Sequence, residues 1–159
     1  FIASLTAMYS QFYSEAAYDN ELKNLDRLHG DDPELFLLLM DHYFGTEQYD
    51  RAIRGLKRLN ARFEDDSMLH YLMSVTYYTA GKQNDANSAI DQAITLEPTN
   101  EDLYWFKADI LIKLKAYSEL VSLIKNLEKD FDAVFDRNSL STIEGWEEFF
   151  NSQEYKDNY

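Results

Sequence analysis

The residue types that most often carry chemistry are sparse and scattered in this chain. Its three histidines, His29, His42 and His70, are 13 and 28 residues apart, so no two have the i, i+4 spacing that places a metal ion on one helix face. Cysteine is absent, which removes disulfides and cysteine-ligated metal sites. We therefore expect no metal centre, and we expect each histidine to serve surface contacts or packing.

Carboxylates occur in two helically spaced pairs, Glu15 with Asp19 and Glu144 with Glu148. Neither pair has a neighbouring base, which general acid–base catalysis requires, so we interpret both pairs as solvated helix faces. The glycines form no phosphate-binding loop, since they lie apart at positions 30, 45, 55, 81 and 145. The sequence thus predicts neither an enzyme nor a cofactor.

Charge narrows the classes of ligand. The chain has a net charge of -14 and repels phosphate backbones, so we do not expect it to bind nucleic acid. The acidity either only maintains solubility or also attracts basic partners. No apolar run approaches the ~18 residues that cross a bilayer, so we expect no membrane insertion. Because the chain begins at Phe1 rather than Met, we interpret it as a piece of a longer protein or as a processed product. Its compartment is not indicated, and a soluble, cytoplasmic location is the default.

The elements that would position any binding residue are repeats. Three units follow a 34-residue period: residues 33–66, 67–100 and 101–134. Apolar side chains recur at matching positions, as in the column Leu56, Ile90 and Ile124. A period of this length belongs to stacked helix–turn–helix units, and the scarcity of glycine and proline also favours long helices.

Residues 67–100 resemble the tetratricopeptide repeat (TPR). The family's tyrosine, turn glycine, two packing alanines and proline correspond to Tyr77, Gly81, Ala86, Ala93 and Pro98. The resemblance implies an all-α fold, a right-handed α-α superhelix of three helix–turn–helix repeats within one domain over residues 1–159. It also implies that Ala86 lies where the two helices of the unit approach most closely, and Ala93 where the next unit packs.

Two flanking segments would complete this domain. Residues 1–32 have helical spacing and form either a degenerate fourth repeat or an N-terminal helix pair. Residues 135–159 are predicted to form a C-terminal cap, with Ser139 as the N-cap of its helix. One apolar stripe on that helix would dock on the last repeat, with Gly145 in mid-helix; it comprises Ile143, Trp146, Phe149 and Phe150.

In the TPR family the first helices of successive units line a concave groove. The resemblance assigns three inward positions to each unit: Leu37, Asp41 and Phe44; Tyr71, Val75 and Tyr78; Trp105, Asp109 and Ile112. Most of these side chains are large and apolar or aromatic, as in binding hot spots. They could instead pack as core against the chain's own helices, or against a second copy in a homo-oligomer.

The family's basic clamp for a C-terminal carboxylate is missing, because its positions hold Asp41, Val75 and Asp109. We therefore expect a protein or peptide partner that is apolar with some Lys or Arg, met as a helix or an extended segment. The leading interpretation is a non-catalytic interaction scaffold within a larger bacterial protein. Two alternatives stay open: the regulatory or structural end of an upstream enzyme or membrane protein, and a secretion chaperone with such repeats.

Overall fold

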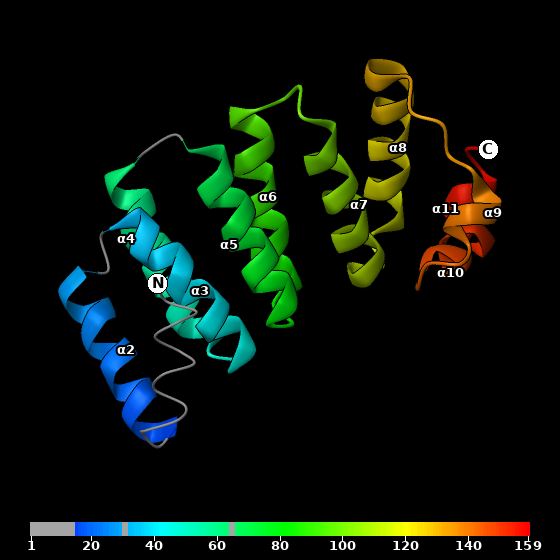
Figure 1. The fold of residues 1–159 in the computed structure, drawn as a ribbon. Coiled ribbons are helices and arrows are strands. Elements are labelled where there is room, and N and C mark those ends of the chain that lie inside the picture. Colours follow the sequence, from blue (N-terminus) through cyan, green and yellow to red (C-terminus); the bar gives the residue numbers. More distant parts are fainter. Residues whose placement is uncertain (1–14, 30–31, 64–65) are drawn as a thin grey trace. The chain divides into compact units, whose positions relative to one another are not determined.

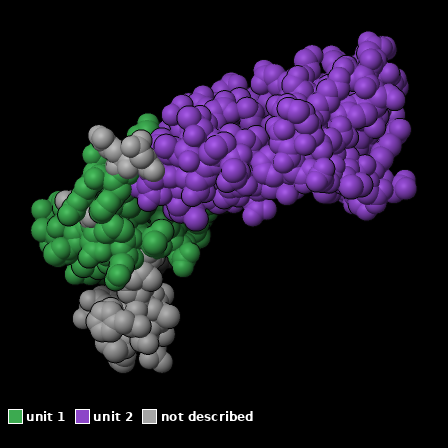
Figure 2. Space-filling view, turned by 90° about the horizontal axis from the view of Figure 1, so that it is seen from above, with its two compact units in different colours: residues 1–64 green, residues 65–159 purple. Residues whose placement is uncertain are grey.

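A computed structural model describes residues 15–29, 32–63 and 66–159, and every regular element within those ranges is a helix (Figure 1). The chain divides into two compact units, unit 1 with residues 1–64 and unit 2 with residues 65–159 (Figure 2). The all-α prediction is confirmed. The expected N-terminal helical segment is covered only from Glu15 onward, because residues 1–14 lie outside the described residues.

Unit 1 contains α2 (Glu15–His29), α3 (Pro33–Gly45) and α4 (Tyr49–Arg62), with α3 packed against both of the others. Helix α3 starts at a strong local signal. The Asp32 carboxylate accepts hydrogen bonds from the backbone N–H groups of Glu34 and Leu35 at 3.0 and 3.3 Å, and Pro33 fits the first helical position because it has no N–H to leave unpaired.

Helices α3 and α4 approach closely because Gly55 has no side chain. The Phe36 ring is fully buried against it, and a Cβ atom on Gly55 would lie 1.9 Å from Cε2 of that ring. On the same buried face of α4, Ala52 and Leu56 are also fully inaccessible to solvent. This pairing is the core of the first repeat and leaves the opposite face of α4 to solvent.

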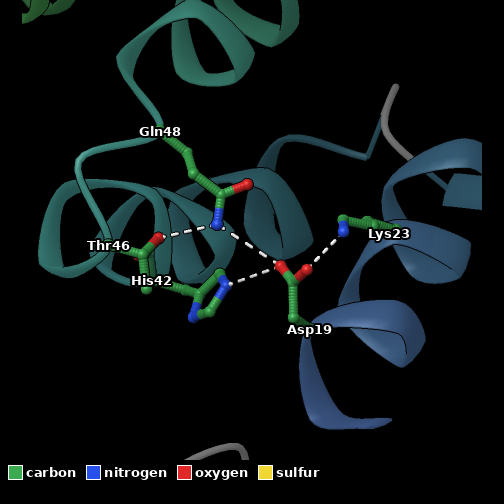
Figure 3. Close-up of polar contacts among 5 residues, drawn as sticks. All are labelled: Asp19, Lys23, His42, Thr46 and Gln48. Carbon is green, nitrogen blue, oxygen red and sulfur yellow. Dashed lines mark hydrogen bonds and ion pairs between the residues drawn. The ribbon is translucent and has the colours of Figure 1, made fainter. Parts of the chain in front are cut away.

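A polar network joins α2 to α3 and to the turn before α4 (Figure 3). The Asp19 carboxylate forms an ion pair with Lys23, accepts a hydrogen bond from Nε2 of Gln48 at 3.3 Å, and lies 3.5 Å from Nε2 of His42. Gln48 also donates to the Thr46 hydroxyl at 2.8 Å. The hydrogen bond from Lys23 is the main reason that the pKa of Asp19 lies below its usual range. The network holds α2 on α3.

Unit 2 contains α5 (Ser67–Thr79), α6 (Gln83–Leu96), α7 (Glu101–Leu114) and α8 (Tyr117–Phe131), each packed against the next. Ala86 and Ala93 are fully buried, as predicted for small residues at close helix contacts. At the first contact the buried Ser74 hydroxyl donates to the carbonyl of Ala86 at 2.7 Å. Short side chains therefore bring the two helices of the second repeat within hydrogen-bonding distance.

The turn inside each repeat has one residue in the left-handed backbone region, and these residues keep the 34-residue spacing. They are Glu47 (φ 56°), Gly81 (φ 73°) and Lys115 (φ 55°). Glycine adopts this conformation without steric cost, whereas Glu47 and Lys115 are strained there. The turn geometry thus persists in the first and third repeats without the glycine that marks it in the second.

The C-terminal segment differs from the single capping helix that the sequence predicts. It forms α9 (Arg137–Leu140), α10 (Trp146–Asn151) and α11 (Gln153–Lys156), and Asp136 rather than Ser139 caps α9. Contrary to the prediction, Gly145 does not lie within a helix but directly before α10. Its φ of 91° is incompatible with a continuous α-helix through this position. The physical reason is packing, since a Cβ atom here would lie 2.3 Å from Cγ2 of Ile112 on α7.

Docking of this segment on the last repeat is confirmed, with one correction to its contact set. Trp146, Phe149 and Phe150 are each at most 2% exposed and share a core cluster with residues of α7 and α8. Ile143, the fourth member of the predicted stripe, is 49% exposed because it lies in the turn before Gly145 rather than on a helix face.

Candidate partner-binding faces

The expected inward positions of the first repeat lie on α3 in unit 1. Leu37 and Asp41 are exposed, and Leu37 keeps half of its surface in solvent. Phe44 is half-buried and packs edge-to-face on Tyr49 of α4, with ring centroids 5.6 Å apart. The spacing of four and then three residues places the trio on one helix face. This α3 face therefore combines an exposed apolar side chain, Leu37, with an exposed carboxylate, Asp41.

The inward positions of the second repeat form an aromatic cluster in unit 2. Tyr71 and Tyr78 of α5 both contact Phe106 on α7 in edge-to-face geometry, with centroid distances of 5.5 and 5.6 Å. Val75 lies between them in the helix, and all three α5 side chains are half-buried. The two tyrosines therefore combine core packing with an exposed surface that could contact a partner, because part of each ring packs between repeats while the remainder is exposed.

The inward positions of the third repeat are largely covered by the chain's own C-terminal segment. The Trp105 ring lies 4.8 Å from that of Phe135, and its indole N–H donates to Glu101 at 2.8 Å. Ile112 is buried under Gly145. Asp109 alone of this trio is exposed. Of the inward positions in unit 2, Asp109 is therefore exposed and the α5 aromatics are partly exposed, whereas Ile112 is buried and Trp105 is partly covered.

The electrostatics around Tyr78 and Asp109 reflect partial enclosure. Burial raises the pKa of the Tyr78 hydroxyl, while Lys113 opposes this and Asp109 and Glu144 add to it. Burial also raises the pKa of Asp109, although its side chain reaches solvent. The nearby Trp146 indole lowers that pKa, but its N–H makes no hydrogen bond of normal geometry. Lys113, one turn further along α7, also lowers the pKa of Asp109, so a neighbouring cation already offsets part of its negative charge.

Beside this carboxylate, Lys113 and Glu144 form an ion pair at 2.9 Å that links α7 to the C-terminal segment. Each partner shifts the other as expected, since the pKa of Lys113 is raised and that of Glu144 is lowered. Lys113 therefore mainly neutralises Glu144. The negative charge of Asp109 remains on the exposed surface beside this ion pair.

Sequence reasoning missed several residues of this surface. Phe106 and Phe135 complete the aromatic packing, and Met68, three residues before Tyr71, extends the α5 face with 61% of its surface exposed. The helical spacing of Met68 from Tyr71 and Val75 was a usable signal. No local sequence signal identifies Phe135, because it lies outside the repeats and its contact with Trp105 depends on the path of the chain after α8. We define the α5–α7 face as Met68, Tyr71, Val75, Tyr78 and Asp109.

The three histidines lie on three different helices, α2, α3 and α5. His29 is exposed, His42 lies beside Asp19 and His70 is half-buried. Within residues 15–29, 32–63 and 66–159 no group of three His, Asp or Glu side chains could hold a metal ion. Over the same ranges, no helix is both long and apolar enough to cross a membrane.

Comparisons with known proteins agree with this architecture. No curated protein matches the chain. Among solved structures, the TPR2B domain of yeast Sti1, determined in complex with pHsp70, aligns with a TM-score of 0.55 and 16% sequence identity. The alignment covers 79% of this chain and 97% of that domain, and at this identity it supports the fold alone. A family model described as the tetratricopeptide repeat matches residues 3–142. Because that match spans most of its length, the chain belongs to the tetratricopeptide repeat family.

Proposed function

We propose that this chain is a non-catalytic interaction module that holds a peptide or helix of a partner protein on the inner faces of its first helices. Membership of the TPR family supports the general role, as does the solved neighbour, which is itself a complex with pHsp70. The observation that carries the specific proposal is the half-exposed pair of tyrosines that contact Phe106 next to the exposed carboxylate of Asp109. Such aromatic groups bury much area at little cost in side-chain entropy.

The partner should combine apolar side chains with at least one Lys or Arg. Apolar groups would cover the exposed parts of Met68, Tyr71 and Tyr78, and a cation would compensate Asp109. The α3 face of unit 1, with Leu37 and Asp41, has the same chemistry and is a separate candidate contact of this kind. A C-terminal carboxylate of a partner would require basic groups at positions 41, 75 and 109, but these positions hold Asp41, Val75 and Asp109.

Selection of peptides from a random 16-residue display library tests the proposal. Enriched peptides should carry apolar residues with Lys or Arg. For a selected peptide, Tyr78→Ala should weaken binding by about 2 kcal/mol, roughly 30-fold, which is the hot-spot scale. Gln92→Ala, on the exposed surface of α6, is the matched control and should leave affinity unchanged.

Two further readouts make the test sharper. Tyr78→Phe keeps the ring and should retain most of the affinity, and circular dichroism should show that neither Tyr78 variant loses helix. Raising salt from 50 to 500 mM should weaken binding several-fold if Asp109 meets a cation. Peptides that bind Tyr78→Ala and the parent protein equally well, yet lose affinity for Gln92→Ala, would move the site to the outer surface and refute the proposal.

A further inference from the structure

The exposed face of α4 in unit 1 is strongly basic on an otherwise acidic protein. Helix α4 contains five of the chain's 15 basic residues and only one of its 29 acids, Asp50. Four of the five bases are exposed: Arg54, Lys57, Arg58 and Arg62. They follow one another at helical spacing on the face opposite the buried one, so they form a single stripe. We call these four residues the α4 stripe.

Structural roles account for part of this stripe but not for all of it. Arg58 forms an ion pair with Asp26 that ties α4 to α2, and Arg62 lies in the last turn, where a positive charge favours the helix dipole. Neither reason applies to Arg54, which lies in mid-helix with its side chain in solvent. The concentration of guanidinium groups also matters, because arginine binds carboxylates through two parallel hydrogen bonds.

We propose that the α4 stripe is a second interaction surface, which binds an acidic helical segment of a partner protein. From Arg54 to Arg62 the helix rises about 12 Å, the length of roughly two helical turns. A helix with Glu or Asp at i, i+4 and i+8 would place one carboxylate against each turn of the stripe. This surface is independent of the α5–α7 face and selects the opposite charge.

The surroundings of the stripe favour a narrow acidic segment over an extended polyanion. Asp50 precedes the stripe, and the depression beside Arg62 is lined by Leu28, His29, Asp32, Pro33 and Glu34. A membrane surface or a nucleic acid backbone is an extended polyanion and would approach these carboxylates together with the stripe, which costs electrostatic repulsion. A single helix can place its acidic side chains on the stripe alone.

Apolar groups at the same end complete the surface. The guanidinium of Arg62 lies 5.4 Å from the ring centroid of Phe63, which is 40% exposed, and Leu28 in the depression is 59% exposed. A partner helix with one large apolar side chain beyond its acidic stripe would cover these groups while its carboxylates meet the α4 stripe.

The test uses three labelled 16-residue peptides, with binding followed by fluorescence anisotropy at 150 mM salt. The first is a Glu-rich helix with acids at i, i+4 and i+8 and one leucine, the second has the same composition in scrambled order, and the third has Lys in place of each Glu. We expect only the patterned acidic peptide to bind. The double variant Arg54→Glu/Lys57→Glu should reduce its affinity at least tenfold.

The matched control is Lys125→Glu/Lys129→Glu on the exposed surface of α8, which changes the net charge by the same amount and should leave affinity within twofold. Tyr78→Ala should also leave it unchanged. Equal losses in both double variants, or equal binding of the scrambled peptide, would show a non-specific charge effect and overturn the proposal. Binding of vesicles with 30% phosphatidylserine, or of duplex DNA, that is lost in the α4 variant would overturn it in favour of a membrane or nucleic acid.

Discussion

Substitution of Gly145 by alanine should destabilise unit 2 through two separable effects. The first is backbone strain, since an alanine at φ 91° incurs the cost of left-handed conformation, about 1–2 kcal/mol. The second is overlap with the buried Ile112, whose Cγ2 would lie 2.3 Å from the new Cβ, and overpacking of this kind costs about 1–3 kcal/mol. Together they predict a loss of about 2–5 kcal/mol.

Gly81 provides the matched control, because it has φ 73° but nothing within 4 Å of an added Cβ. Gly81→Ala should therefore lose only the backbone part, about 1–2 kcal/mol. Ile112→Leu removes the branch methyl Cγ2 and alone should cost less than about 1.5 kcal/mol. Combined with Gly145→Ala it should recover the steric part, so the two substitutions are expected to be non-additive by about 1–3 kcal/mol. Combined with Gly81→Ala it should be additive.

Urea unfolding followed by tryptophan fluorescence measures these effects. Both tryptophans of the chain, Trp105 and Trp146, belong to unit 2 and lie beside Phe135, so their emission reports on the docked C-terminal segment. If Gly145→Ala costs no more than Gly81→Ala, or if Ile112→Leu gives no recovery, then the segment does not pack on α7 as described.

Three further predictions concern single positions. Gly55→Ala should lower the stability of unit 1 by about 1–3 kcal/mol in thermal unfolding followed by circular dichroism, because its Cβ would overlap the Phe36 ring, whereas Gly45→Ala has open space and should be neutral or slightly stabilising. Glu47→Gly should stabilise by up to about 1 kcal/mol, since it relieves a φ of 56° in an exposed turn. Burial raises the folded-state pKa of Asp109, so ionisation of this carboxyl lowers the stability of the folded protein as pH rises through that pKa. Asp109→Asn should therefore melt at a higher temperature than the parent at pH 7, and the difference should vanish below about pH 4, where the carboxyl is protonated in both states.

The repeats could be predicted because their signals are local and periodic. Small residues at Ala86 and Ala93 mark close helix contacts, and the apolar column through Leu56, Ile90 and Ile124 is buried throughout. The residue types of Glu47 and Lys115 give no sign of a left-handed conformation, and only their 34-residue spacing from Gly81 marks them as turn residues.

The C-terminal segment and the covering of the third inward face could not be predicted, because both depend on contacts between distant residues. A glycine at position 145 is compatible with a helix interior as well as with a break, and its contact with Ile112 decides between them. Similarly, Trp105 occupies an inward position of its helix but packs against Phe135, which lies outside the repeats. A periodic pattern places side chains on faces, but it does not indicate what later covers those faces.

We propose that a partner segment binds the α5–α7 face of unit 2, and this contact can be mapped residue by residue. Amide chemical-shift mapping with a library-selected peptide locates the contact without any substitution, because each backbone N–H group gives its own signal. We expect the largest shifts on Tyr71, Tyr78 and Asp109, with little change along α6. Shifts concentrated on α6 and α8, with the α5–α7 face unaffected, would contradict this proposal.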